Sequence, residues 1–68
     1  MKIQLLNDGG YLCLSHVEFP ATVNATLDDY RRAEVAIQEL RKIGYKENEN
    51  YFDDEETLVF TPEEYALV

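Results

Sequence analysis

The sequence TLDDYRRAEVAIQELRKIG, residues 26–44, carries the longest pattern of one kind in this chain of 68 residues. Its apolar side chains recur every three or four residues, which is the spacing of one face of an α-helix. The residues of that face are Leu27, Tyr30, Ala33, Ala36, Ile37, Leu40 and Ile43, and Val35 falls outside it. The pattern predicts one long amphipathic helix that covers a sheet.

Signals at both ends support this helix. Thr26 is a favourable N-cap residue, and Asp29 stands where a capping-box acid would return the hydrogen bond, although that position favours Glu or Gln. Gly44 supplies a left-handed stop, after which Tyr45 can fold back onto Leu40. The start and the stop therefore agree with the periodicity between them.

The segment before the helix reads as a hairpin followed by an extended stretch. Residues 2–6 alternate as a strand does, residues 7–10 (Asn-Asp-Gly-Gly) predict a turn, and residues 11–17 predict a second strand. The proline of Phe19-Pro20 interrupts this strand, because it lacks a backbone donor. Residues 21–25 are either a short edge strand or the extended lead into the helix.

The segment after the helix reads as a second hairpin. Residues 45–52 are polar and predict an edge strand or a loop, residues 53–56 a turn, and residues 57–60 the last strand. Residues 61–64 (Thr-Pro-Glu-Glu) have the pattern of a helix start. We therefore expect a single domain over residues 1–68 of the α+β class. Its antiparallel sheet has ββαββ order, with the central amphipathic helix on one face and a short C-terminal helical turn.

The length and the cysteine content limit how the fold is stabilised. Cys13 is the only cysteine, so neither a disulfide scaffold nor a zinc site built from several thiolates is expected. A chain this short has a small core, and it relies on good packing or on self-association such as a homodimer. No leader pattern and no apolar run near 18 residues is visible, so a cytoplasmic protein is expected.

The net charge of −8 lies entirely in the last third of the chain. Residues 1–46 hold six acidic and six basic residues, whereas residues 47–68 hold eight acidic and no basic residues. Those eight acids are Glu47, Glu49, Asp53, Asp54, Glu55, Glu56, Glu63 and Glu64. A field of one sign repels nucleic acid and anionic membranes, and it steers the protein toward a basic protein surface.

These features predict a non-enzymatic protein-binding module. The acidic edge would dock on a basic, nucleic-acid-binding surface of a partner and inhibit it as a DNA mimic, as small phage-encoded inhibitors do. Two alternatives remain open. In one, the acids only keep the domain soluble. In the other, the chain is a homodimeric structural or accessory subunit whose apolar sheet face includes Tyr11, Cys13 and Val17.

No catalytic or metal-binding pattern is expected. On a strand, Cys13 and His16 point to opposite faces, so they cannot form a thiolate–imidazole pair. The acidic residues 47–56 lack the central glycine of a calcium-binding EF-hand loop, and there is no glycine-rich phosphate loop. The sequence therefore predicts no enzyme, no cofactor and no metal site.

Overall fold

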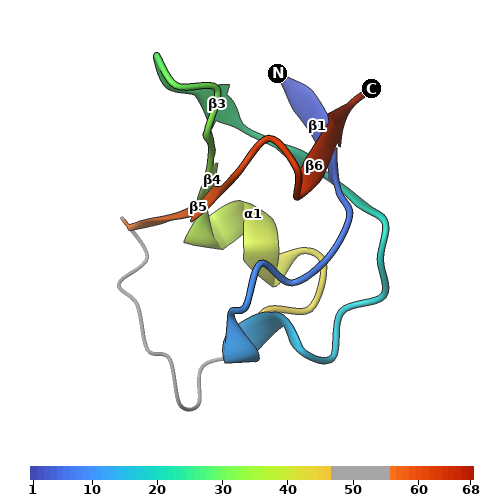
Figure 1. Cartoon of the computed structure of the whole chain (residues 1–68). Helices are drawn as coiled ribbons and strands as arrows, with labels where there is room; N and C mark the ends of the chain where they lie inside the picture. The colour runs from blue at the N-terminus through green and yellow to red at the C-terminus, as the bar shows by residue number, and fades with distance from the viewer. Residues whose placement is uncertain (47–55) are drawn as a thin grey trace.

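The computed structural model describes residues 1–46 and 56–68, and it shows six short strands and two short helices there (Figure 1). In chain order these are β1 (Lys2–Leu5), the 3-10 helix η1 (Leu12–Leu14), β2 (Ala21–Asn24), β3 (Thr26–Leu27), β4 (Ala33–Ala36), α1 (Ile37–Arg41), β5 (Thr57–Phe60) and β6 (Tyr65–Leu67). This is a small domain of the mostly-β or α+β class, but the expected ββαββ order is wrong.

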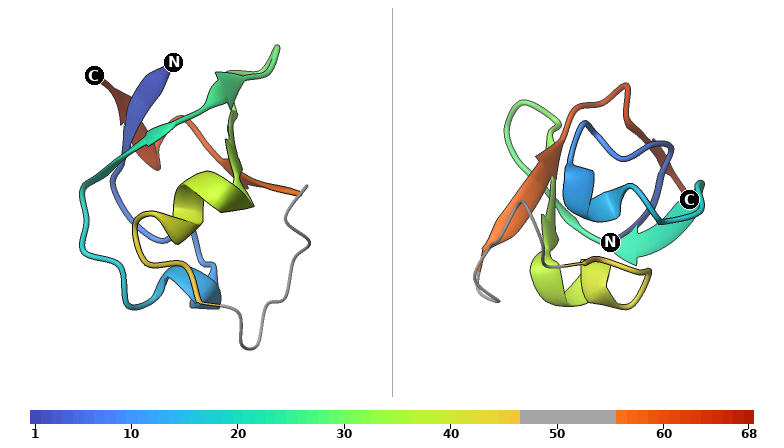
Figure 2. Two further views of the ribbon diagram at one scale, coloured as in Figure 1. Left: turned by 180° about the vertical axis from the view of Figure 1, so that it is seen from behind. Right: turned by 90° about the horizontal axis from the view of Figure 1, so that it is seen from below.

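The strands form two antiparallel sheets of three strands each. One sheet has the order β2-β1-β6 and the other has the order β3-β4-β5. The two sheets are joined where β2 runs into β3 through the buried Ala25, a continuous run of chain that Figure 2 shows from behind. Because β1 pairs with β2 and β6, both ends of the chain meet in one sheet.

Buried apolar side chains from both sheets and from both helices form one core. They are Ile3, Leu5, Cys13, Leu14, Val23, Ala25, Ala33, Val35, Ile37, Leu40, Tyr45, Leu58, Phe60 and Tyr65. No buried polar or charged residue is found within the described ranges. Burial of apolar surface is the main stabilising contribution that such a chain has.

The single helix predicted over residues 26–44 is wrong. That stretch folds as β3, a turn, β4 and only then α1. Val35, the residue that fell outside the helical stripe, is fully buried, and Ala33 and Val35 alternate with the half-exposed Glu34 along β4. The period in this half of the stretch is therefore two residues, as in a strand.

The Asp28 side chain explains why the helix does not begin early. Its Oδ1 accepts hydrogen bonds from the backbone amides of Tyr30 and Arg32, each at 2.8 Å. Short acidic side chains offer the backbone this alternative to helical hydrogen bonds. The turn then allows β4 to pair with β3 on one side and with β5 on the other.

The predicted stop at Gly44 is confirmed. Gly44 has a φ of +115°, its amide donates to the Arg41 carbonyl at 3.4 Å, and the Tyr45 amide donates to the Leu40 carbonyl at 3.0 Å. These two hydrogen bonds are those of a Schellman motif. Tyr45 and Leu40 are both buried, as the expected fold-back requires.

Two of the predicted strands are confirmed, one open alternative is decided in favour of a strand, and one predicted strand is wrong. The strands predicted at residues 2–6 and 57–60 are β1 and β5, and residues 21–25 form the edge strand β2. Residues 11–17 contain η1 instead of a strand, with the Leu14 amide donating to the Tyr11 carbonyl and the Ser15 amide donating to the Leu12 carbonyl. The neighbours Cys13 and Leu14 both enter the core from this turn. Consequently no hairpin joins this segment to β1.

The predicted C-terminal helical turn is also wrong, although its first hydrogen bonds form. The Glu64 Oε1 accepts from the Thr61 amide at 2.8 Å, and the Glu64 amide donates to the Thr61 carbonyl at 2.9 Å. The chain then leaves this turn as β6, because pairing with β1 overrides the local preference. Of the predicted segment 45–52 and the predicted turn 53–56, residues 47–55 lie outside the described residues.

Candidate functional site

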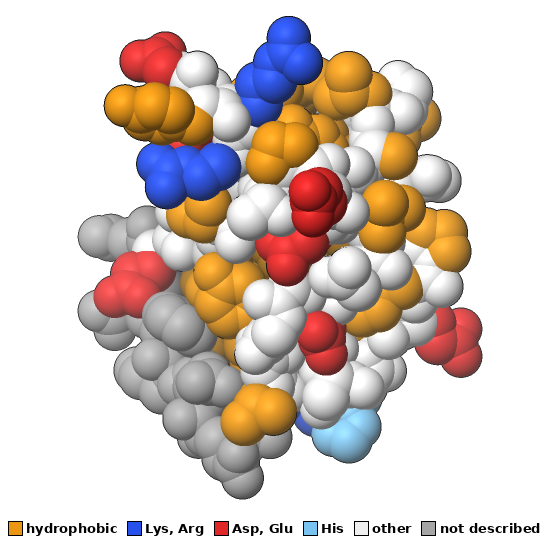
Figure 3. Space-filling view, in the orientation of Figure 1, with side chains coloured by type: hydrophobic (Ala, Val, Ile, Leu, Met, Phe, Trp, Pro, Cys, Tyr) orange, Lys and Arg blue, Asp and Glu red, His pale blue; other side chains and the backbone are white. Residues whose placement is uncertain are grey.

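An open groove lies between the β3–β4 turn and β6. Its volume is about 460 Å³, which falls in the size range of ligand pockets. The groove is lined by Leu27, Arg31, Pro62, Tyr65 and Leu67. Figure 3 shows hydrophobic and basic side chains together at the upper end of the molecule, where Figure 1 places β3 and the two termini.

The β3–β4 turn forms one wall of the groove, and Asp28 holds it in shape. The Arg32 side chain adds an ion pair to the two amide hydrogen bonds, because its Nε donates to the Asp28 Oδ2 at 2.8 Å. The turn places Arg31 in the left-handed region with a φ of +64°. This conformation is uncommon for a residue with a side chain, and the Asp28 hydrogen bonds on either side maintain it.

The ionisation of Asp28 reflects these contacts. Desolvation alone would raise its pKa, but the hydrogen bonds from the Arg32 backbone and side chain and from the Tyr30 amide outweigh it. The pKa of Asp28 is therefore lowered from its ordinary value. The turn is held by a carboxylate that remains charged at neutral pH.

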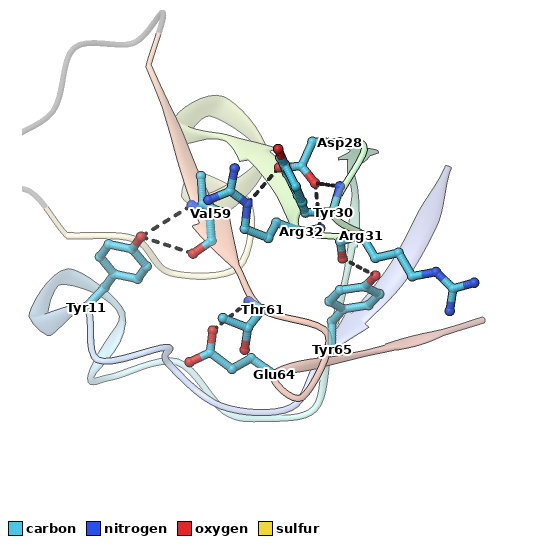
Figure 4. Close-up of polar contacts among 9 residues, drawn as sticks. All are labelled: Tyr11, Asp28, Tyr30, Arg31, Arg32, Val59, Thr61, Glu64 and Tyr65. Atoms are coloured by element: carbon cyan, nitrogen blue, oxygen red, sulfur yellow. Dashed lines mark hydrogen bonds and ion pairs between the residues drawn. The ribbon is translucent and has the colours of Figure 1, made fainter.

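Tyr65 of β6 forms the floor of the groove and ties it to the opposite wall. Its ring is buried, and its hydroxyl donates a hydrogen bond of 2.7 Å to the Arg31 carbonyl (Figure 4). This hydrogen bond connects β6 to the β3–β4 turn, although the two segments are far apart in the sequence. The Arg31 side chain itself extends away from Tyr65, and within residues 1–46 and 56–68 no carboxylate forms an ion pair with it.

Leu67 leaves much of its apolar surface uncovered at the open end of the groove. It lies on the same side of β6 as Tyr65, but its exposed fraction is 64%. Val68, the next residue, is 75% exposed. Leu67 therefore leaves exposed apolar surface at the end of the groove.

The outer edge of β6 borders this surface. The Leu6 amide donates to the Glu64 carbonyl at 2.8 Å, and Gln4 lies opposite Ala66. Because alternate residues of a strand direct their backbone groups to opposite edges, Glu64 and Ala66 face β1. The N–H and C=O groups of Tyr65 and Leu67 therefore point outward, and no described backbone group pairs with them there.

Two other sheet edges are protected by side chains. On β5, the Tyr11 hydroxyl donates to the Val59 carbonyl at 3.1 Å and accepts from the Val59 amide at 3.3 Å. On β2, the Asn24 amide donates to the Glu39 Oε1 at 3.2 Å. Native proteins block exposed strand edges in such ways to prevent unwanted pairing. The described part of β6 has no comparable side-chain cap.

The structure describes only three of the eight acidic residues predicted to bind a partner. Glu47, Glu49, Asp53, Asp54 and Glu55 lie outside the described residues. Glu56, immediately before β5, and Glu63, in the turn after it, are exposed. Glu64 is half-buried, and its carboxylate holds the turn by accepting from the Thr61 amide, so it is already engaged within the chain.

The apolar surface expected for a homodimer does not form as predicted. Cys13 is fully buried in the core, Val17 packs against that core, and the Tyr11 hydroxyl is bonded to β5. Burial also raises the pKa of the Cys13 thiol. His16 is exposed, whereas Cys13 lies in the interior.

Sequence reasoning did not find the groove. Four of its residues are Leu27, Arg31, Tyr65 and Leu67, and the sequence pattern predicts a helix or a terminal helical turn for them. The sequence signal for this turn is the pair Asp28 and Asp29, because Asp side chains accept hydrogen bonds from nearby backbone amides in turns.

The described residues contain no group of three or more His, Cys, Asp or Glu side chains that could hold a metal ion. Within the same ranges, no helix has the length and apolar character needed to cross a membrane. Comparison of the chain with protein-family models, with curated proteins and with solved structures found no match.

Proposed function

We propose that this protein is a non-enzymatic, acidic protein-binding module that docks on a basic surface of a partner and excludes nucleic acid from it. The observation that carries the proposal is the separation of charge along the chain. Residues 1–46 are neutral in sum, whereas residues 47–68 carry all of the net charge of −8. A field of one sign opposes compact folding through self-repulsion, so it is more readily explained by a use in recognition.

The described acids are consistent with this use. Glu56 and Glu63 are exposed near the two ends of β5, and neither forms an ion pair with another described residue. Carboxylates on a protein surface attract the Lys and Arg side chains that bind phosphates. Nucleic acid and this protein would then compete for the same basic side chains, which is how such a module would inhibit its partner.

The first experiment tests whether the acids of residues 53–56 are required. The tagged protein is incubated with nuclease-treated lysate, bound proteins are eluted with a sodium chloride gradient, and they are identified by mass spectrometry. The test variant carries Asp53→Asn, Asp54→Asn, Glu55→Gln and Glu56→Gln. The control variant carries Asp8→Asn, Glu18→Gln, Asp29→Asn and Glu34→Gln, which removes the same four charges from residues 1–46.

We expect a nucleic-acid-binding protein that the wild type and the control variant retain and the test variant loses. Its binding should weaken steeply as salt rises, because the interaction replaces bound counterions. The purified partner should also release its nucleic acid when the wild-type protein is added. Equal retention by the two variants, or binding that does not change with salt, would contradict the proposal.

A further inference from the structure

We propose that the groove beside β6 binds an extended peptide segment of a partner, which pairs with the outer edge of β6 and places a carboxylate at Arg31. This surface adjoins Glu63 and Glu64, which stand between Pro62 and Tyr65, but none of the acidic residues of the proposed function lines the groove. The inference is therefore independent of that proposal, and it stands or falls on its own test.

The backbone of β6 supplies the first part of the argument. The outward N–H and C=O groups of Tyr65 and Leu67 are spaced as the pairing groups of an antiparallel strand. Strand addition at such an edge is a common mode of peptide recognition, in which main-chain hydrogen bonds contribute the affinity. The caps on Val59 and Asn24 leave β6 and β3 as the edges without a side-chain block in the described structure, and β6 is the longer of these two strands.

The groove supplies the second part. A strand that pairs with β6 directs every second side chain to the side on which Tyr65 and Leu67 lie. That side opens onto the groove of about 460 Å³ with its apolar lining of Leu27, Pro62, Tyr65 and Leu67. An apolar side chain of the peptide would enter it and cover the exposed surface of Leu67.

Arg31 supplies the third part and determines the chemistry of the partner. Its backbone is fixed by the Tyr65 hydroxyl, so the side chain starts from a defined point on the groove wall. A guanidinium group pairs well with a carboxylate through two parallel hydrogen bonds. The fitting partner segment thus has apolar residues at alternate positions and an acidic residue at one end.

A second copy of this chain fits less well than such a peptide. Its β6 residues, Tyr65–Leu67, carry no charged side chain for Arg31, and the carboxylate of the preceding Glu64 already accepts a hydrogen bond from the Thr61 amide. A net charge of −8 on each copy also opposes association. The exposed apolar residues at β6 are few, while a stable dimer buries about 800 Å² on each partner. A second copy is therefore treated as a competing outcome of the test.

The experiment uses synthetic peptides and the full chain labelled with nitrogen-15. The two probes are acetyl-Glu-Val-Thr-Val-Thr-amide and acetyl-Thr-Val-Thr-Val-Glu-amide, which place the carboxylate at either end. Binding is followed by amide chemical shifts. We expect a dissociation constant below about 1 mM for at least one probe, since short strand additions bind weakly. The shifted amides should be those of Leu27, Arg31, Tyr65 and Leu67.

Backbone methylation tests strand pairing without requiring its register. Two versions of the better probe are methylated on alternate amides, so that one version has its methyl groups toward β6 and the other has them toward solvent. One version should lose binding and the other should retain it. Equal affinities of the two methylated peptides would overturn the proposal.

A double-mutant cycle tests the contact with Arg31. Arg31→Asn is chosen because Asn tolerates the left-handed backbone of this residue, and Lys46→Asn is the control because it removes the same charge from another exposed site. Arg31→Asn should weaken the Glu probe about three- to fivefold, and it should have no effect on the same probe with Gln. Lys46→Asn should have no such selective effect.

Two further results would overturn the proposal. The first is the absence of shifts at β6 with either probe. The second is movement of the β6 amide shifts when the labelled protein is concentrated without peptide, which would show that a second copy occupies the edge.

A Leu67→Lys variant should lose probe binding, while Leu12→Lys, the same change at another exposed leucine, should retain it.

Discussion

Gly9 shows how closely a single residue is fitted to the core. Its φ is +62°, and a Cβ atom built there would lie 2.9 Å from the Phe60 Cε1. Phe60 is fully buried, and its ring packs edge-on against the Tyr11 ring with centroids 5.6 Å apart. The neighbouring Gly10 has a φ of +83° and no atom within 4 Å of such a Cβ. The two glycines therefore share a backbone requirement but differ in their surroundings.

Alanine substitutions separate these two effects. Gly10→Ala should lower the free energy of unfolding by about 1–2 kcal/mol, which is the cost of a left-handed backbone with a side chain. Gly9→Ala should lower it by about 2–4 kcal/mol, because overpacking against the Phe60 ring adds to that cost. Urea unfolding of both variants measures the difference. Equal losses in the two variants would show that the ring moves aside freely.

At the scale of an element, the β3–β4 turn and α1 each depend on one carboxylate. Hydrogen bonds from the Lys42 side chain and the Asn24 amide lower the pKa of Glu39, as the contacts of the turn lower that of Asp28. A carboxyl group whose pKa is lower in the folded state than in the unfolded state stabilises the protein at pH values above its unfolded pKa. That unfolded pKa is about 4 for these side chains. That stabilisation is lost as the pH falls through the unfolded and then the folded pKa.

The Asp28→Asn variant tests this dependence in the turn. The difference in free energy of unfolding between wild type and Asp28→Asn should be constant near neutral pH. It should decrease as the pH falls below about 5. Chemical unfolding at a series of pH values between about 7 and 3 measures it. Asp29→Asn removes the same charge from the same turn without disturbing the Asp28 hydrogen bonds, so its stability should follow that of the wild type more closely. A pH-independent difference for Asp28→Asn would contradict the assignment.

The elements also show which parts of the fold can be predicted from sequence. The strands β1 and β5 and the stop at Gly44 follow from local pattern, and they form as predicted. The helix over residues 26–44 fails because the spacing of Ala33, Ala36 and Ile37 fits a helical face as well as a strand that leads into a helix. The deciding interactions are the Asp28 hydrogen bonds and the pairing of β4 with two strands, and pairing partners distant in sequence are not visible in a local pattern.

The candidate site was less predictable than the fold. Its groove joins Leu27 and Arg31 to Tyr65 and Leu67, residues more than 30 positions apart, and it exists only because β6 pairs with β1. The capping-box hydrogen bond from the Thr61 amide to Glu64 forms as predicted, yet the helix it should start does not. A local signal is thus correct at its own residues and overridden one residue later by tertiary pairing.

At the scale of the whole molecule, the charge of −8 affects both stability and binding. Like charges repel each other more when the chain is compact than when it is unfolded. Screening by salt therefore favours the folded state, whereas it weakens docking on a basic partner. The stability of the folded protein should therefore rise with salt, while its affinity for a basic partner should fall. These opposite responses distinguish repulsion within the chain from attraction to a partner.

Thermal unfolding at pH 7 in sodium chloride from about 0.02 M to about 0.5 M measures the internal effect. We expect the Tm to rise with salt. The variant with Asp53→Asn, Asp54→Asn, Glu55→Gln and Glu56→Gln has a net charge of −4 instead of −8, and its Tm should rise less. A wild-type Tm that falls with salt would show that favourable ion pairs outweigh the repulsion, and a constant Tm would show that the two effects balance.

The position of Cys13 has a practical consequence for following these changes. The thiol is the only one in the chain, it is fully buried, and burial raises its pKa, so a thiol-alkylating reagent meets no reactive thiolate in the closed molecule. Alkylation must wait until η1 separates from the core, and its rate then equals the fraction of open molecules multiplied by the rate for a free thiol. The rate of alkylation at Cys13, followed by mass spectrometry, therefore reports how often the core opens, and no label has to be introduced.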